Sequence, residues 1–167
     1  LWAMKLRDLR AVDADYATTG PNGQQLRQEV PVAPEVLFAC LADGPAWKEW
    51  LGIEVEWTSA PPFGEGTTRT VRTGGQQIDE YFHVWEPGRR INFRFDRTTL
   101  PMAAFAEDYL IEPTAEGSVL VWRYAFEWGG WFPGLMSSVF PAFFNLNGRR
   151  ARKKLQKLLA KDPLRFA

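Results

Sequence analysis

The order of the elements that can be predicted along this 167-residue chain indicates an α+β fold, in which a curved antiparallel sheet grips one long C-terminal helix. Three observations lead to this prediction. A short strand precedes the helical stretch VPVAPEVLFACLADGPAWKEWL, a run of strands with short turns follows, and the chain closes on an amphipathic helix. This order also predicts an apolar pocket between the sheet and the helix.

The first elements are one strand and two short helices. Residues 1–23 mix charged, turn-forming and small residues, and we expect a loosely packed N-terminal arm. Residues 25–32 are the first predicted strand. Pro34 suits the first position of a helix, Gly44 ends that helix, and Pro45 begins a second one. Two such helices can close one end of a sheet.

Short turns separate the strands that follow. The sequences TGG, EPGR, TTLP and PTAEG favour antiparallel neighbours. The predicted strands cover residues 53–57, 67–73, 76–85, 90–98, 103–112 and 118–128.

The last predicted element is a helix over about 135–161, in which Pro141 marks either a kink or the true start. Its apolar stripe falls on one face at helical spacing. The stripe consists of Met136, Phe140, Phe143, Phe144, Asn147, Ala151, Leu155 and Leu158. The other face of its second half is strongly basic. We interpret that face as a solvated surface, with docking to an anionic membrane as the minor alternative.

Alternation along the strands predicts which side chains face the pocket, because successive residues point to opposite faces of a sheet. The bulkier set of each strand is expected to face inward. The predicted inner set is Ile78, Glu80, Phe82, Val84, Ile91, Phe93, Phe95, Phe105, Glu107, Tyr109, Ile111, Leu120, Trp122, Tyr124 and Phe126. His83 and Trp85 belong to the outer set.

Two carboxyl groups therefore fall on the inner face, Glu80 and Glu107. A buried carboxylate needs a partner or takes up a proton. Arg69 is the nearest candidate partner by strand order. The structural interpretation is an internal ion pair or a carboxylate at the rim. The functional interpretation is a polar anchor that orients a ligand or moves a proton.

The same stretches resemble the polyketide cyclase/dehydrase and lipid-transport family, a bacterial subgroup without assigned roles in the START/Bet v 1-like (SRPBCC) superfamily. The resemblance covers nearly the whole chain. It lies in VPVAPEVLFACLADGPAWKEWL, VEWTSAPPFGEGTTRTV, FHVWEPGRRINFRF, LPMAAFAEDYLIEP and GSVLVWRYAFEW. It implies the helix-grip architecture, with a seven-stranded antiparallel sheet around the C-terminal helix and two small helices between the first two strands.

What the resemblance implies for function is a deep hydrophobic cavity. Relatives hold lipids, sterols, polyketides or plant hormones there, and no catalytic motif is shared by all of them. Some relatives with ring oxygenase activity bind iron through His and Asp. His83 is the only histidine here, so no metal site and no cofactor are expected.

Composition sets further bounds. Lys+Arg and Asp+Glu are both 20, so no nucleic-acid partner is expected. Apolar runs are too short for stable membrane insertion, and a cytoplasmic location is expected. Cys40, the only cysteine, lies in an apolar helix and is interpreted as a buried structural thiol. The domain is expected over 24–162, with residues 163–167 as a tail.

We hypothesise first that the protein binds a lipid-, polyketide- or aromatic-like molecule, and we favour binding over catalysis. The expected lining is Trp50, Phe93, Phe95, Tyr109, Trp122, Tyr124, Phe140 and Phe144. The alternative is a cyclase or dehydratase, with Glu107 or Glu80 as proton shuttle and Tyr109 or Arg69 as oxyanion partner.

A third hypothesis is an interaction domain without a ligand. Exposed Trp128, Trp131 and Phe132 would form its surface patch, although capping of the pocket mouth is the favoured role for them. The sequence leaves a monomer and a homodimer open.

Overall fold

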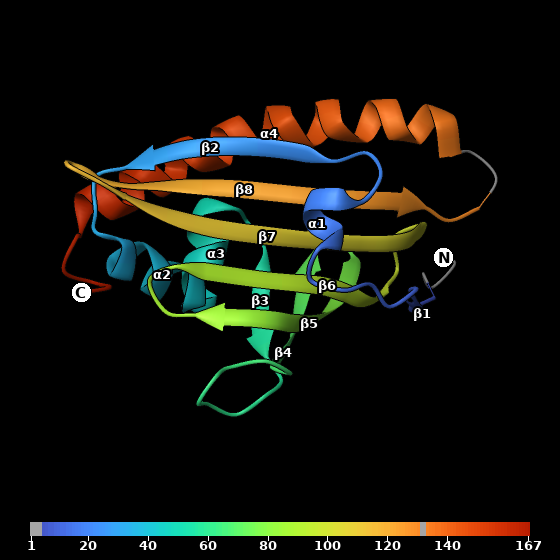
Figure 1. The fold of residues 1–167 in the computed structure, drawn as a ribbon, viewed down its shortest axis with the longest axis horizontal. Helices are drawn as coiled ribbons and strands as arrows, with labels where there is room; N and C mark the ends of the chain where they lie inside the picture. The colour runs from blue at the N-terminus through green and yellow to red at the C-terminus, as the bar shows by residue number, and fades with distance from the viewer. Residues whose placement is uncertain (1–4, 131–132) are drawn as a thin grey trace.

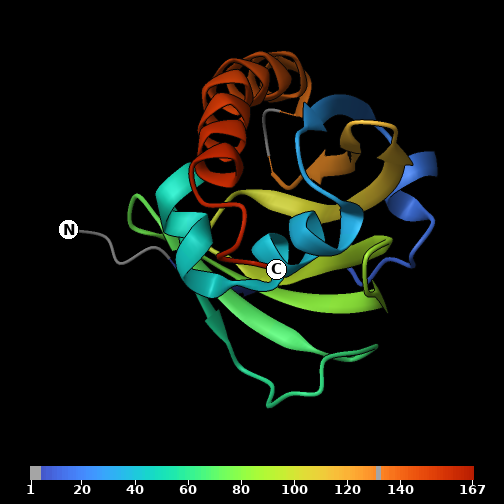
Figure 2. The same ribbon diagram turned by 90° about the vertical axis from the view of Figure 1, so that its left-hand side faces the viewer.

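A computed structural model describes the backbone of residues 5–130 and 133–167, and the side chains of residues 5–130 and 147–167. The chain forms a curved, fully antiparallel sheet with one long helix lying across its open side (Figures 1 and 2). Its elements are β1 (Arg7–Asp8), α1 (Tyr16–Thr19), β2 (Gln24–Val30), α2 (Pro34–Ala42), α3 (Gly44–Trp50), β3 (Glu54–Trp57), β4 (Thr68–Thr73), β5 (Gln76–Glu86), β6 (Arg90–Thr98), β7 (Met102–Thr114), β8 (Gly117–Trp128) and α4 (Pro133–Lys161).

The strand order β2-β8-β7-β6-β5-β4-β3 confirms the predicted architecture, and the short β1 is an additional strand that pairs with β6. β8, the last strand along the chain, pairs with β2, which precedes the two short helices. The sheet is open, with β2 and β3 at the two ends of this order, and it curves so that α2, α3 and α4 share its concave side (Figure 2). The apolar core lies in this concavity.

Two short helices close one end of the sheet, as predicted. Pro34 occupies the first turn of α2, where a missing backbone N–H costs nothing. Asp43, rather than Gly44, makes the junction, because its carboxylate accepts a hydrogen bond from the backbone N–H of Ala46 at 2.9 Å and so caps α3. This cap fixes the turn that brings Trp47 into the core.

The long helix begins at Pro133, so Pro141 lies inside it and does not mark its start. In its described part the buried positions are Gly148, Ala151, Leu155 and Leu159. Asn147 is exposed, which differs from the predicted stripe. The predicted stripe residues Met136, Phe140, Phe143 and Phe144 lie outside the residues whose side chains are described. No helix of the described residues is long and apolar enough to cross a bilayer.

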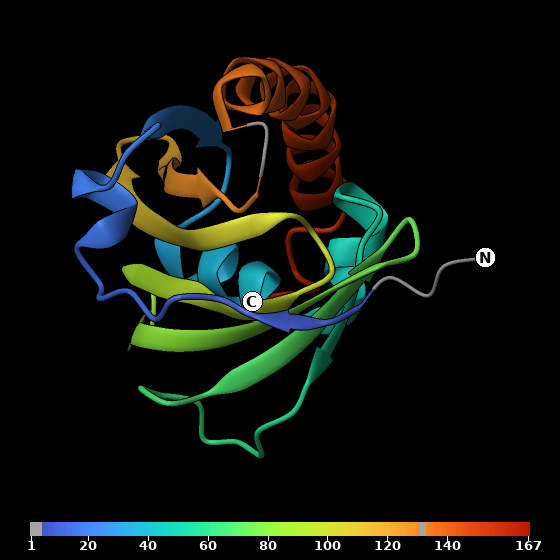
Figure 3. The same ribbon diagram turned by 90° about the vertical axis from the view of Figure 1, so that its right-hand side faces the viewer.

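The N-terminal segment is not the loosely packed arm that the sequence predicted. It runs along the outer side of the sheet (Figure 3), where Val12 and Ala17 are buried against Ala104 and Ala106 of β7. The small side chains of β7 leave room for the chain to approach closely. Gly20 is required at the end of this segment, because a Cβ atom there would lie 2.6 Å from the carbonyl oxygen of Tyr16.

The same segment fills a gap in the sheet. β6 pairs with β7 only over 90–94, and beyond that point the two strands separate. Arg7 and Asp8 pair with the free end of β6, and the backbone N–H of Arg10 donates to the carbonyl oxygen of Ala103 on β7 at 2.9 Å. The segment therefore satisfies backbone groups on both strands, which explains why it is ordered.

Candidate functional site

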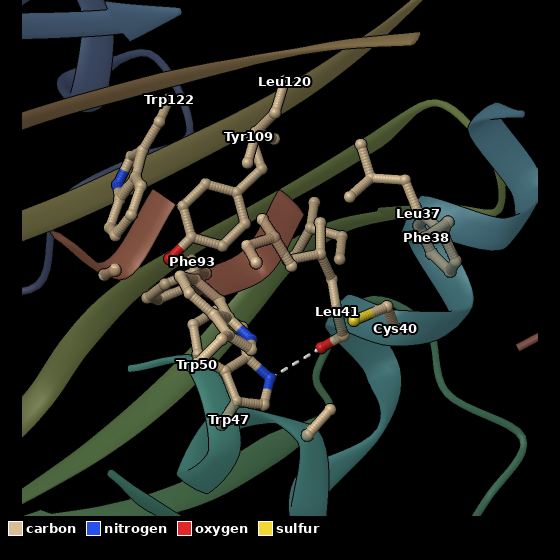
Figure 4. Close-up of a cluster of buried hydrophobic side chains, with 14 of the residues drawn as sticks. Leu37, Phe38, Cys40, Leu41, Trp47, Trp50, Phe93, Tyr109, Leu120 and Trp122 are labelled. Carbon is tan, nitrogen blue, oxygen red and sulfur yellow. Dashed lines mark hydrogen bonds between the residues drawn. The ribbon is translucent and has the colours of Figure 1, made fainter. Parts of the chain in front are cut away.

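The concave face is lined by aromatic rings that come from both the sheet and α3. Tyr109 and Trp122 extend from β7 and β8 toward Trp47 and Trp50 of α3, with Phe93 beside them (Figure 4). The ring centroids of Tyr109 and Trp122 lie 5.2 Å apart, and those of Trp47 and Trp50 lie 4.7 Å apart. Edge-on and tilted contacts at these distances are the favourable geometries for aromatic pairs.

A buried donor in this lining, on Trp50, has no partner among the described residues. The Nε1–H of Trp50 is buried and makes no hydrogen bond to the described residues, although the side chain is only 1% exposed. The neighbouring Trp47 differs, because its Nε1–H donates to the carbonyl oxygen of Leu41 at 2.9 Å (Figure 4). A buried donor without an acceptor costs free energy, so the position of Trp50 needs a reason other than stability.

A second group of rings extends the lining toward one end of the sheet. Phe95 stacks on Phe105 with centroids 4.2 Å apart, and Phe105 stacks on Tyr124 at 5.9 Å. All three side chains are buried on the concave face, as the alternation predicted.

The predicted inner face fails in one place, at the end of β5. A bulge lies between Phe82 and Val84, so the extra residue His83 shifts the alternation. Trp85 then pairs with the inward-facing Ile91, and its ring contacts Phe82 at 5.6 Å. Trp85 therefore faces the core and Val84 does not, which reverses the prediction for both. Trp57 and Phe63 complete this ring cluster, and the prediction omitted both.

Arg69 lies at the centre of the aromatic lining and forms an ion pair with Glu80, through its Nε–H and the Oε2 of the carboxylate. The two side chains are 3% and 5% exposed. Four rings surround the guanidinium, with the carbon Cζ at 4.9 to 5.5 Å from the ring centroids of Trp47, Phe93, Phe82 and Trp57. Such contacts stabilise a desolvated cation. The predicted pairing of Arg69 with Glu80 is confirmed.

Glu107 is the second carboxyl on the concave face and lies directly opposite Phe93 and Tyr124 in the sheet. Its Oε2 accepts hydrogen bonds from the hydroxyl of Tyr109 at 2.6 Å and from the Nε1–H of Trp122 at 2.9 Å. Burial raises the pKa of Glu107 to about 8; the hydrogen bond from Tyr109 opposes this, and the nearby charge of Glu80 adds to it. The raised pKa places proton exchange near neutral pH.

The pKa values of the neighbouring groups shift for the same physical reason. Burial raises the pKa of Glu80, and the charge of Arg69 opposes that effect. Burial raises the pKa of Tyr109 well above its usual value, and the charge of Glu107 adds to it. The hydroxyl of Tyr109 therefore stays protonated and acts as a hydrogen-bond donor.

The structure thus brings Arg69, Glu80, Glu107 and Tyr109 together within one aromatic lining. Of the eight residues predicted to contact a ligand, six are buried on the concave face: Trp50, Phe93, Phe95, Tyr109, Trp122 and Tyr124. The other two, Phe140 and Phe144, lie outside the described side chains. The prediction missed Trp47, although its place three residues before Trp50 on a short helix was a signal for a shared face.

The other residues considered in the sequence lie outside the polar cluster formed by Arg69, Glu80, Glu107 and Tyr109. Cys40 is fully buried, and burial raises the pKa of its thiol to about 12, which makes it inert. His83 lies on the outer face beside Tyr81, where burial lowers its pKa. The described residues contain no cluster of His, Cys, Asp or Glu side chains that would bind a metal ion. Trp128 is half-buried and packs against the core, while Trp131 and Phe132 lie outside the described residues.

An open groove of about 710 Å³ lies elsewhere, where the end of β2 and the turn between β7 and β8 meet the second half of α4. It contains none of the predicted ligand-binding residues. Its walls are charged and its floor is partly apolar, with lining residues Glu29, Val30, Pro31, Thr114, Ala115, Glu116, Ser118, Lys153, Gln156, Lys157 and Ala160.

Solved structures share this fold at low sequence identity. A protein named Ara h 8.0201 superposes with a TM-score of 0.64 at 14% identity, over 83% of this chain and 97% of that one. The protein TTHA0849 from Thermus thermophilus gives a TM-score of 0.65 at 18% identity, over 81% and 94% of the two chains. DynU16, from the dynemicin biosynthetic locus, gives 0.61 at 19% identity, over 81% of this chain and 47% of that one.

Sequence relatives are more similar. Uncharacterized proteins of Mycobacterium tuberculosis and Mycobacterium bovis are 38% identical over 151 residues, which cover 87% of this chain and 89% of theirs. The family model described as polyketide cyclase / dehydrase and lipid transport matches residues 25–160. This match and the helix-grip architecture agree, and the chain belongs to the polyketide cyclase/dehydrase and lipid-transport family.

Proposed function

We propose that the protein binds a hydrophobic small molecule between the concave face of the sheet and α4. The observation that supports this most is the placement of Glu107 and the Arg69–Glu80 pair inside an aromatic lining. Buried ion pairs and carboxyls add little to stability and often lower it. A few polar groups within an apolar lining are typical of small-molecule sites.

The ligand class follows from the lining and the family. Large flat rings favour lipid-, polyketide- or aromatic-like molecules, in agreement with a family described by polyketide cyclisation and lipid transport. The proposed contacts are the six buried aromatic residues named above, together with Phe140 and Phe144 of α4.

Catalysis is the second candidate function, and the pKa of Glu107 favours it. A general acid or base works best when its pKa is near the working pH, and the pKa of Glu107 is raised to about 8. In this case Glu107 or Glu80 would move a proton during cyclisation or dehydration, and Tyr109 or Arg69 would stabilise a developing oxyanion. Once a substrate is known, unchanged turnover in Glu107→Ala would remove this candidate.

Native mass spectrometry of freshly purified protein, followed by a denaturing measurement, tests binding directly. We expect extra mass that disappears on denaturation, and its identification would give the ligand class. Titration with the neutral fluorophore N-phenyl-1-naphthylamine provides a second measurement. A clean mass together with no fluorophore binding would contradict the proposal, because the interior would then be filled by side chains.

Two variants on the same helix locate the site. Ala151 is buried against the core on α4, whereas Ala160 is exposed and lines the open groove. Ala151→Phe adds bulk to the interior, and Ala160→Phe adds the same bulk to the groove. We expect only Ala151→Phe to weaken fluorophore binding, with circular dichroism confirming that both variants fold. The opposite result would place the ligand in the groove.

A further inference from the structure

The polar cluster on the concave face has two carboxyl groups and one cation among the described residues. Arg69 contacts Glu80 directly, and both side chains are almost completely buried. Glu107 accepts hydrogen bonds only from the neutral groups of Tyr109 and Trp122. One cation compensates one carboxylate, so an ionised Glu107 would leave a buried negative charge without a counter-ion, which is costly.

Charge balance therefore assigns a proton to this cluster, and the contacts assign it to Glu107. Glu80 touches the guanidinium, which favours its charged form, whereas Glu107 has no cation in contact with it in the described part of the chain. The pKa of Glu107, raised to about 8 by burial, agrees with this assignment. At neutral pH the side chain is a carboxylic acid.

The hydrogen bonds also indicate which oxygen carries the proton. Oε2 accepts from both Tyr109 and Trp122, at 2.6 and 2.9 Å, and these two donors use its two lone pairs. We assign the proton to Oε1, because this position leaves both hydrogen bonds to Oε2 in place. Because both hydrogen-bond partners of the side chain bind Oε2, the Oε1–H group has no acceptor among the described residues. Glu107 as a whole is 6% exposed.

We propose that the Oε1–H group of Glu107 donates a hydrogen bond to an acceptor oxygen on the ligand, and that the ligand is an uncharged, largely apolar molecule with a carbonyl, such as a ketone, ester or quinone. The proposal rests on the proposed function. A carbonyl oxygen accepts without donating, which matches the Oε1–H donor of Glu107, while Oε2 of the same carboxyl already accepts from Tyr109 and Trp122. An anionic ligand lacks a counter-ion here, because Arg69 is already paired with Glu80. Aromatic walls suit a flat skeleton around that carbonyl.

Protonation can be tested without a ligand, by infrared difference spectroscopy between the wild type and Glu107→Gln. At pH 7 we expect the carbonyl stretching band of a buried carboxylic acid, shifted in D₂O, in the wild type and not in the variant. Absence of this band from the wild type would overturn the inference. Glu107→Gln keeps the acceptor for Tyr109 and Trp122 and is therefore expected to fold.

The ligand preference is tested with two probes of the same shape, 9-fluorenone and fluorene, which differ in one carbonyl. For each protein we take the affinity for 9-fluorenone divided by the affinity for fluorene. Dividing this ratio in the wild type by the ratio in Glu107→Leu removes the contribution of the probes' different hydration, which is the same in both proteins. We expect a quotient of roughly 5, the value of one neutral hydrogen bond of about 1 kcal/mol. Glu107→Gln, which keeps an N–H donor, is expected to retain the preference.

The pH dependence separates donation from a structural role. The preference of the wild type for 9-fluorenone should disappear as the pH rises through about 8, where Glu107 loses its proton. The preference of Glu107→Gln should not change with pH. If the affinity ratio of the two probes is the same in the wild type and in Glu107→Leu, this inference is overturned while the proposed function stands. If neither probe binds the wild type, both are overturned.

Discussion

Glu107 and Asp108 are neighbours on β7, and the sheet buries them on opposite faces by opposite means. On the outer face, Asp108 is fully buried and binds the guanidinium groups of Arg90 and Arg123, each at 2.7 Å. Asn92 donates to it at 3.0 Å as well. On the concave face, Glu107 has neutral partners and no cation in contact among the described residues. The first arrangement satisfies a carboxylate completely, and the second keeps a carboxyl protonated.

The difference indicates which face is built for stability and which for a ligand. The cluster around Asp108 also fixes the N-terminal segment, because the Nδ2–H₂ group of Asn92 donates to the carbonyl oxygen of Ala14. Both oxygens of Asp108 are paired with arginines, while Oδ1 of Asn92 and Nε of Arg123 in the same cluster have no hydrogen-bond partner among the described residues. On the concave face, the Nε1–H group of Trp50 has no acceptor among the described residues. Buried atoms without a partner therefore occur on both faces, and the difference lies in the counter-ions: Asp108 contacts two guanidinium groups and Glu107 contacts none among the described residues.

The largest loss of stability is expected when Glu80 loses its cation, so that it is buried without a counter-ion, as Glu107 is among the described residues. Arg69→Met removes the only cation in the described part of the concave cluster and leaves Glu80 buried without a partner. We expect a loss of about 3–5 kcal/mol in the free energy of unfolding, measured by urea denaturation at pH 7. The double variant R69M/E80L should recover at least half of this loss. A small effect of Arg69→Met would mean that water reaches the cluster.

The next prediction concerns the pH dependence of stability. Glu107 has a pKa of about 8 in the folded protein and close to its ordinary value of 4.5 in the unfolded chain. Between these values the unfolded state has released a proton that the folded state keeps, so stability falls as the pH rises. The expected slope is about 1 kcal/mol per pH unit, and it ends below 4.5 and above 8.

Glu107→Gln is the matched variant for this measurement. It should flatten the pH profile of unfolding free energy between pH 5 and 8, and should exceed the wild type in stability by about 3 kcal/mol at pH 9. Identical slopes in the two proteins would show that Glu107 is ionised in the folded state, and the contrast with Asp108 would be lost.

A smaller loss is expected on the outer face. Asp108→Asn removes the charge that pairs with Arg90 and Arg123, but both arginine side chains are 27% exposed and can turn to solvent. We expect a loss of about 2 kcal/mol in unfolding free energy. Faster amide hydrogen exchange in residues 9–20 should accompany it, since this cluster holds the segment. Unchanged exchange there would show that the apolar contacts of Val12 and Ala17 suffice.

The smallest effect is expected at a third carboxyl of the same strand. Glu112 pairs with Arg27 at 2.9 Å, and both side chains are about half exposed. Glu112→Gln should cost less than about 1 kcal/mol, and 0.5 M salt should remove most of the difference. This variant is the control for the other three, because it changes a charge on β7 without changing a buried one.

Alternation along the strands predicted the concave face well where a strand is continuous. Leu120, Trp122, Tyr124 and Phe126 follow one another at every second residue of β8 and are all buried on that face. The ion pair of Arg69 with Glu80 could also be predicted, because strand order and parity place the two side by side.

Other features depend on information that one strand does not contain. The bulge at His83 arises from the register between β5 and β6, so Trp85 could not be assigned to the correct face by counting. The docking of residues 7–20 depends on the point where β6 and β7 separate, which is a property of the whole sheet. The missing cation beside Glu107 is likewise visible only when all described strands are in place.

The second half of α4 makes the surface charge of the protein uneven. Arg149, Arg150, Lys153, Lys154, Lys157 and Lys161 are exposed along this helix, which contains no acidic residue, while the chain as a whole is neutral. The balancing negative charge therefore lies on other elements of the chain, and we expect an uneven distribution of surface charge. We expect the protein to be retained by a cation-exchange resin at the pH of zero net charge and to be released at modest ionic strength.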